Sequence, residues 1–75
     1  MKTIYTKAYK ELLGRLKQAR IKADLTQVKV ARALRKPQSY VSKIEMGERR
    51  LDPIELKKFA GLYKVSVSWL AGESV

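Results

Sequence analysis

The residues that decide the fold are Thr26–Gly47, which read TQVKVARALRKPQSYVSKIEMG. Apolar side chains in this stretch recur three or four positions apart, which is the spacing of one face of an α-helix. Thr26 is a good N-cap for the first of two helices. Lys36 precedes Pro37 and is therefore pushed out of the α region, so this helix ends near Arg35-Lys36. The stretch predicts two short helices joined by a very short turn.

The second of these helices has two unlike faces. Pro37 suits the first turn of a helix, and on a wheel of about 100° per residue Val41 and Ile44 lie on one side. The opposite side is polar and consists of Gln38, Ser39, Ser42 and Lys43. Gly47 is well placed to end the helix in the left-handed conformation. The apolar face would anchor this helix to a core, and the polar face suits a DNA major groove about 12 Å wide.

Helical spacing of apolar residues continues on both sides of this stretch. Before it, a helix is expected over about 7–23, with an apolar stripe along one face. After it, Asp52 is an N-cap, Pro53 occupies the first helical position and Glu55 the third, which is the pattern of a capping box. The buried stripe of this helix is expected to be Leu56, Phe59, Ala60 and Tyr63.

A last short helix is expected over 66–71, with Val67 and Leu70 inward and Gly72 ending it. The 75 residues include only four Gly and two Pro, too few for the many turns of an all-β chain. We therefore predict an all-α fold, a compact five-helix domain. The expected organisation is a basic arm at 1–8, the domain at 9–72 with the paired helices at about 26–46, and a tail at 73–75.

The composition excludes several function classes. The chain has no Cys and no His, so it has no disulfide framework, zinc finger, thiolate nucleophile or imidazole base. Its serine hydroxyls lack an activating base and its seven Asp and Glu are scattered, so no enzyme, metal site or cofactor is expected. No apolar run approaches the ~20 residues of a membrane span, and the N-terminal lysines are not followed by an apolar stretch. We expect a cytoplasmic, nucleoid-associated protein with no membrane contact.

The excess of positive charge lies in one part of the chain. Seventeen Lys and Arg against seven Asp and Glu give a net charge of +10. Residues 1–50 hold 14 basic and 4 acidic side chains, whereas residues 51–75 hold three of each. A basic face opposite a neutral one favours a polyanionic partner, most often nucleic acid. The alternative is a solubilising surface, although a small domain needs a net charge of only about 2–8 for that purpose.

The order of these features resembles the Cro/CI-type helix-turn-helix family of phage repressors and bacterial xenobiotic-response-element regulators. The resemblance covers 12–72, about four fifths of the chain. It is carried by Arg20, Leu25-Thr26-Gln27, Val30-Ala31, Leu34, Ser39, Val41-Ser42-Lys43-Ile44-Glu45, Gly47, Leu56, Phe59-Ala60 and Val65-Ser66-Val67-Ser68-Trp69-Leu70. It implies a lambda-repressor-like, DNA-binding transcription regulator.

Three positions depart from the family pattern. Where the family often has Gly, this chain has Asp24, Arg35 and Lys64. A left-handed residue other than Gly costs about 1 kcal/mol more. We therefore expect an adjusted turn after each of the helices that end at Arg35 and Lys64, and Arg35 is a further candidate for a phosphate contact.

Four side chains on the polar face are candidates for reading bases: Gln38, Ser39, Ser42 and Lys43. A Gln amide pairs bidentately with adenine, and a Lys ammonium donates to guanine O6 and N7, so Gln38 and Lys43 are expected to discriminate most. The alternative is that Lys43 contacts only a phosphate, and that both serines merely permit close approach.

Candidates for contact with the DNA backbone are Thr26, Gln27, Lys29, Lys36, Tyr40, Arg49 and Arg50. The resemblance implies that Gln27 binds a phosphate and braces the recognition helix, and a helix N-terminus attracts anions in any case. Lys29 is unfavourable in a first helical turn unless a phosphate lies there, and is otherwise a tolerated surface lysine. Three roles are open for Tyr40: its hydroxyl bonds a phosphate, its ring contacts a thymine methyl, or the side chain packs on the fold. The resemblance implies that the loop with Arg49 and Arg50 lies along the DNA backbone and can enter the minor groove, and arginine suits both sites. The alternative is a solvated charge pair beside the preceding glutamate.

Two further sets of residues have structural or assembly roles. Arg20 and Glu45 lie on inward-facing stripes, and Glu45 opposes the dipole at the end of its helix and so needs a cation. The resemblance implies a salt bridge between them, and loss of one partner of a buried pair costs about 3–5 kcal/mol. Leu62 falls off the core stripe and joins Val67 and Trp69 as candidates for a dimer contact. The alternative is that Trp69 only caps the core.

The expected function is sequence-specific binding of double-stranded DNA by a transcription regulator. A homodimer, weak in solution and firmer on DNA, would bind a palindromic site with its recognition helices about 34 Å apart and repress by occluding the promoter. One alternative is an antitoxin-type protein with a protein partner and autoregulatory DNA binding. Another is nonspecific binding of RNA or an anionic membrane, for which capped, interrupted helices would be unnecessary.

Overall fold

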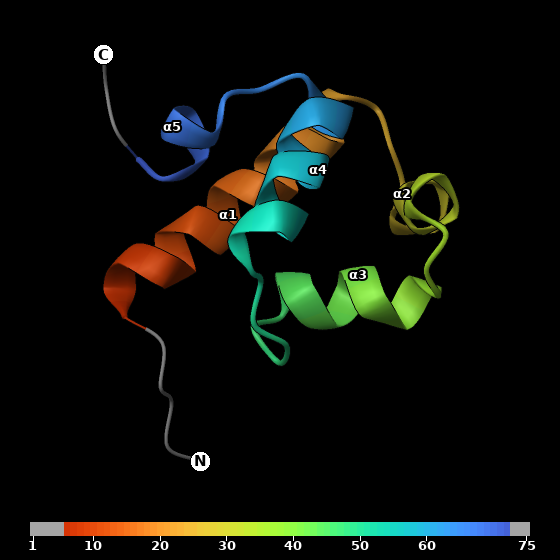
Figure 1. The fold of residues 1–75 in the computed structure, drawn as a ribbon, viewed down its shortest axis with the longest axis horizontal. Helices are drawn as coiled ribbons and strands as arrows, with labels where there is room; N and C mark the ends of the chain where they lie inside the picture. The colour runs from red at the N-terminus through yellow and green to blue at the C-terminus, as the bar shows by residue number, and fades with distance from the viewer. Residues whose placement is uncertain (1–5, 73–75) are drawn as a thin grey trace.

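The structure, a computed structural model, describes residues 6–72. These residues form five helices and no strand: α1 (Lys7–Lys22), α2 (Gln27–Leu34), α3 (Gln38–Glu45), α4 (Pro53–Tyr63) and α5 (Val67–Leu70). α1 packs against α3, α4 and α5, and α2 packs against α3. Figure 1 shows α3 along one edge of the molecule, with α5 on the opposite side of α1 and α4. The predicted all-α fold is confirmed.

The two ends of the expected organisation are described only in part. Residues 1–5 of the predicted arm and the predicted tail at 73–75 lie outside the described residues. α1 already begins at Lys7, so the last two residues of the predicted arm are helical. Thr6 is the N-cap of α1, and its hydroxyl accepts from the backbone N–H of Tyr9 at 3.1 Å. The helix predicted over about 7–23 therefore begins where expected, and residues 7 and 8 belong to it.

Side-chain caps start two central helices where the sequence predicted them. The Thr26 hydroxyl accepts from the Lys29 backbone N–H at 3.1 Å. Asp52 and Glu55 form a capping box, with reciprocal side-chain to backbone distances of 2.8 and 3.0 Å. Pro37 was predicted in the first turn of α3 but is its N-cap, with an extended backbone and no side-chain cap bond. Proline has no side-chain acceptor, so the free backbone N–H groups of the first turn of α3 receive no bond from the side chain of their N-cap residue.

All five described helices contribute to one core. Its largest fully buried side chains are Leu16, Val30, Val41, Ile44, Phe59 and Leu70. Two predictions about the last helices were wrong. Val67 was expected inward but is 37% exposed, because α5 is a single turn and only its Leu70 side faces the core. Leu62 was expected off the core stripe but is half-buried against the core.

The turns at Asp24, Arg35 and Lys64 are left-handed, with φ of 60, 58 and 58°. The expectation of adjusted turns after Arg35 and Lys64 was therefore wrong. The reason lies in the backbone. The N–H of Lys36 donates to the Ala31 carbonyl at 2.9 Å, and the N–H of Val65 donates to the Ala60 carbonyl at 3.0 Å. These bonds close the helix ends only if the intervening residue is left-handed. Closing the helix and docking the next one outweigh the strain of a side chain at that φ.

Replacing Lys64 by glycine should therefore stabilise the protein by about 1 kcal/mol, because glycine adopts this φ without steric strain. A gain of that size raises the melting temperature of a small domain by roughly 4–8 °C. The matched control is Lys57→Gly. Lys57 is also exposed, but it lies inside α4, where glycine should lower the stability by about the same amount. Thermal melts followed by circular dichroism measure both. A melting temperature of Lys64→Gly at or below that of wild type would contradict the prediction.

Candidate nucleic-acid interface

The four predicted base-reading residues share the outer side of α3. Gln38, Ser39 and Lys43 are exposed and Ser42 is half-buried, whereas Val41 and Ile44 on the inner side are fully buried. An α-helix with its side chains is about 10–12 Å in diameter, which fits the width of a major groove, and the eight residues of α3 extend about 12 Å along the helix axis. α3 therefore presents a short polar side while its apolar side is held by the core.

The end of α3 is tied to α1 by the ion pair that the sequence predicted. Arg20 Nε donates to Glu45 Oε2 at 2.7 Å, and Arg20 Nη2 donates to Oε1 at 3.2 Å. Only 11% of the Arg20 side chain and 4% of the Glu45 side chain are exposed. Arg20 Nη1 also donates to the Leu25 carbonyl at 2.9 Å, so the same guanidinium holds the segment between α1 and α2. One arginine thus sets the position of two elements relative to α1.

Gln27 connects this ion pair to the first residue of α3. Its Nε2 donates to Glu45 Oε1 at 3.0 Å, and its Oε1 accepts from Gln38 Nε2 at 3.4 Å. One N–H of Gln38 is therefore engaged, while its carbonyl oxygen and second N–H are available. Adenine offers one acceptor and one donor in the major groove, which those two groups match. Gln27 thus restricts the orientation of the amide that is best suited to read a base.

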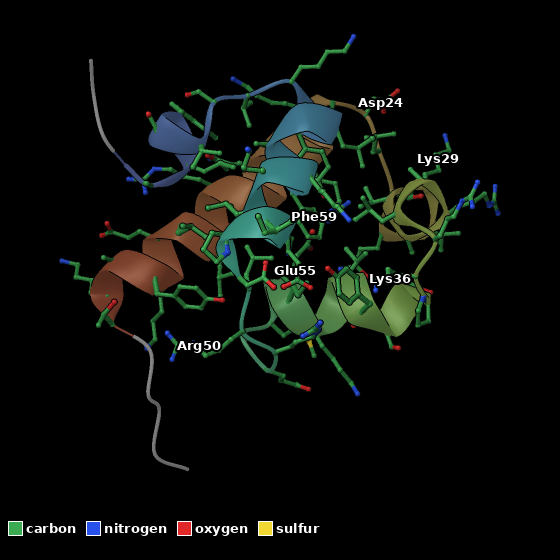
Figure 2. The ribbon with its side chains drawn as sticks, in the orientation of Figure 1. Asp24, Lys29, Lys36, Arg50, Glu55 and Phe59 are labelled. Atoms are coloured by element: carbon green, nitrogen blue, oxygen red, sulfur yellow. The ribbon has the colours of Figure 1, made fainter. Side chains whose placement is uncertain are left out.

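Most of the remaining backbone candidates surround α3. Four of these candidates are exposed: Lys29, Lys36, Arg49 and Arg50. Arg35 and Arg32 are exposed as well, and sequence reasoning did not name Arg32. In Figure 2, Lys29 points away from the body of the fold on the outer side of α2. The Thr26 hydroxyl acts as a cap, as described above. The exposed cations make the surface around α3 strongly basic, which is the electrostatic condition for contact with phosphates.

Tyr40 packs on the fold, which is one of the three roles left open for it. Its hydroxyl donates to Glu55 Oε2 at 2.6 Å, and its ring is stacked on Phe59 with centroids 6.2 Å apart. Lys36 Nζ lies 5.2 Å from the Tyr40 ring centroid. Figure 2 shows Glu55 on the first turn of α4, next to α3. Tyr40 therefore links α3 to α4.

The loop after α3 is held by charge and by aromatic rings. Arg49 Nη2 donates to Glu55 Oε2 at 3.0 Å, and Arg49 Cζ lies 4.9 Å from the Tyr40 ring centroid. Arg50 Cζ lies 5.8 Å from the ring centroid of Tyr9 on α1. Sequence reasoning assigned Glu55 only to the helix cap and missed its contact with Arg49. No local signal could have found it, because the contact depends on how α3 packs against α4.

The contacts among Tyr40, Arg49 and Glu55 shift the pKa values of Glu55 and Tyr40. Burial would raise the pKa of Glu55, but hydrogen bonds from the Asp52 backbone and the Tyr40 hydroxyl, with the charge of Arg49, outweigh it and lower the pKa. Burial, followed by the hydrogen bond to Glu55, raises the pKa of Tyr40 to about 12. The Tyr40 hydroxyl therefore stays protonated at neutral pH and remains a donor.

The lowered pKa of Glu55 predicts a contribution to acid sensitivity. A carboxyl whose pKa is depressed in the folded state stabilises the fold above its unfolded pKa of about 4.3. That contribution is lost as pH falls through the folded pKa. Between about pH 5 and 3, the melting temperature of wild type should therefore fall more than that of Glu55→Gln, which has no proton to gain there. Parallel melting curves for the two proteins across this range would contradict the assignment.

Residues 6–72 contain neither a candidate metal cluster nor a candidate membrane-spanning helix. No group of three or more Asp, Glu, Cys or His there could hold a metal ion. None of the helices described in that range is long and apolar enough to cross a membrane.

The match to known proteins agrees with this geometry. Residues 16–70, which contain α2 to α5 and the end of α1, match the helix-turn-helix family HTH_3. No curated protein matches the chain. The matched span is well over half of the sequence and includes both members of the α2–α3 pair. The chain therefore belongs to the Cro/CI-type helix-turn-helix family and is a DNA-binding transcription regulator.

Proposed function

We propose that this protein recognises a specific sequence of double-stranded DNA by placing α3 in the major groove, and that a dimer on a palindromic site represses transcription by occluding the promoter. The observation that carries the proposal is the polar outer side of α3, whose inner side is fully buried. This outer side, here called the recognition ridge, consists of Gln38, Ser39, Ser42 and Lys43. A rigid, narrow and polar helix surface is what direct readout of base edges requires.

Two side chains at opposite ends of α3 would supply most of the base discrimination. The Gln38 amide, oriented by Gln27, would pair with adenine, and Lys43 in the last turn would donate to guanine. Ser39 and Ser42 lie between them and are small enough to let the helix approach the base edges. The ridge therefore supports recognition of a few consecutive base pairs per protomer.

The basic residues around α3 would hold the domain on the backbone. Lys29, Lys36, Arg49 and Arg50 are exposed on segments that flank α3 on both sides. Such contacts carry no sequence information, but they fix the register of the helix on the duplex. They also make the affinity fall steeply with salt concentration, because each neutralised phosphate releases counterions.

The surface around α5 supports the dimer. Val67 is 37% and Trp69 41% exposed, and both are large apolar side chains on one helical turn. Beside them lies an open hollow of about 360 Å³, lined by Ala19, Lys22, Ala23, Tyr63, Val65, Ser66 and Trp69. α5 lies on the far side of α1 and α4 from α3 (Figure 1), so a second copy docked here would leave the recognition ridge clear. Leu62, half-buried against the core, has less surface to offer.

The test is to enrich random duplexes on the purified protein and to measure affinity for the selected site. We expect one enriched motif with two-fold symmetry, bound at least about a thousandfold more tightly than bulk DNA. No enrichment would overturn the proposed function, and an enriched site without symmetry would overturn the dimer. Amide shifts on adding the selected duplex should include Gln38 to Lys43. Shifts confined to 51–75 would refute the placement of α3.

A further inference from the structure

Glu55 places a negative charge within a basic surface. Its two carboxylate oxygens have separate partners: Oε1 accepts from the Asp52 backbone N–H, whereas Oε2 accepts from the Tyr40 hydroxyl at 2.6 Å and from Arg49 Nη2 at 3.0 Å. The first oxygen caps α4. The second holds one side chain from α3 and one from the loop that follows it. Only 16% of the Glu55 side chain is exposed, so these donors largely replace its water.

Arg49 is held from two directions and is still open to solvent. Its guanidinium is bound by Glu55 at one nitrogen and lies 4.9 Å over the Tyr40 ring. That ring is stacked on Phe59, which is 1% exposed, so the support under the guanidinium is part of the core. The Arg49 side chain is 44% exposed. A guanidinium has five N–H donors, and the bond to Glu55 uses one. Arg49 therefore keeps donors for a phosphate while its orientation is restricted.

We propose that Glu55 is a positioning residue that sets the DNA specificity of this protein by holding Arg49 in one orientation. The proposal rests on the proposed function, since it assigns a role within the same interface. A held guanidinium meets a phosphate only where the backbone of a correctly docked duplex passes. A guanidinium without this restraint follows phosphates in many geometries and adds affinity for any sequence.

Loss of the Oε2 acceptor would lower the ratio of cognate to random-sequence affinity in two ways. Binding to the cognate site would weaken, because Arg49 would have to be ordered during binding. Binding to other sequences would strengthen, because an unrestrained Arg49 could follow phosphates in many geometries. The added net positive charge would raise the affinities for cognate and random duplexes alike, so it would cancel in their ratio. The ratio of cognate to random-sequence affinity is therefore the quantity that Glu55 controls.

The experiment compares wild type with Glu55→Gln. Glutamine is accepted at the third position of a capping box, so its amide oxygen still caps Asp52. An amide nitrogen in place of Oε2 does not accept from Arg49. At one salt concentration, the ratio of affinities for the selected duplex and a random duplex should fall about 3- to 10-fold, the scale of ordering one long side chain. The matched control is Asp52→Ala, which removes the cap of the same helix and leaves Oε2 in place. It should lower the melting temperature and leave the ratio unchanged.

A second arm separates positioning from general stability. In an Arg49→Ala background, the further change Glu55→Gln should no longer alter the ratio, because nothing remains to be positioned. An undiminished fall in that background, or an equal fall in Asp52→Ala, overturns the proposal. An unchanged ratio in Glu55→Gln, while wild type still selects a site, overturns this proposal alone. If wild type selects no site, the proposed function fails and this role of Glu55 fails with it.

Discussion

Replacing Arg20 by alanine should lower the free energy of unfolding by about 3–5 kcal/mol, the usual result of removing one partner of a buried ion pair. The variant would leave the Glu45 carboxylate, whose side chain is 4% exposed, with the Gln27 amide as its one remaining side-chain partner among residues 6–72. It would also leave the Leu25 carbonyl without the bond from Arg20 Nη1. Because small domains have about 5–15 kcal/mol of total stability, the loss should be visible as a large fall in melting temperature.

The matched control is Lys17→Ala, which removes an equal charge from an exposed position on the same helix. It should change stability by less than about 0.5 kcal/mol. Urea unfolding of both variants and of wild type measures the difference. If Arg20→Ala unfolded at the same urea concentration as wild type, the ion pair would not hold α3 on α1.

Replacing Gln38 by alanine should reduce affinity for the selected duplex by about 1–3 kcal/mol, roughly 5- to 150-fold. The variant should also accept other bases at one position of the site, because a bidentate amide–adenine pair is lost. Affinity for random DNA and the melting temperature should stay near wild type, since Gln38 is exposed and its side-chain hydrogen bond to Gln27 is long, at 3.4 Å. Competition gel shifts against duplexes with single base changes measure the preference.

The matched control is Gln18→Ala, an exposed glutamine on α1. A Gln38→Ala variant that kept wild-type preference at every base would exclude Gln38 from readout. Lys43→Ala resolves the alternative left open for that residue. Relaxed preference at one position assigns Lys43 to a base. A uniform loss for all sequences, with the salt dependence reduced by about one phosphate contact, assigns it to the backbone.

Features that depend on neighbours along the chain were predictable. The caps at Thr26 and Asp52 are hydrogen bonds between residues three positions apart, so the residue types alone indicate them. The inward position of Val41 and Ile44 follows from helical spacing. The Arg20–Glu45 pair was predictable for another reason: Glu45 needs a cation, and the family resemblance indicated which one.

Predictions failed where packing competes with a local preference. The strain of a left-handed Arg35 or Lys64 predicted altered turns, but the helix-closing hydrogen bonds and the docking of the next helix outweigh it. Helical spacing alone predicted that Val67 points inward, yet α5 is too short to bury a second side chain.

The order of residues in this chain was sufficient to identify an all-α helix-turn-helix protein with a basic surface. Helix caps and apolar spacing depend on residue types a few positions apart, and net charge depends only on residue counts. Only the tertiary structure decided the partners of the side chains around α3. Gln27 meets Gln38, and Glu55 meets both Tyr40 and Arg49, over separations of 6 to 15 residues. Such contacts depend on the angle at which one helix packs on another. That angle is set by the shape of the whole core, to which all of the helices contribute at once.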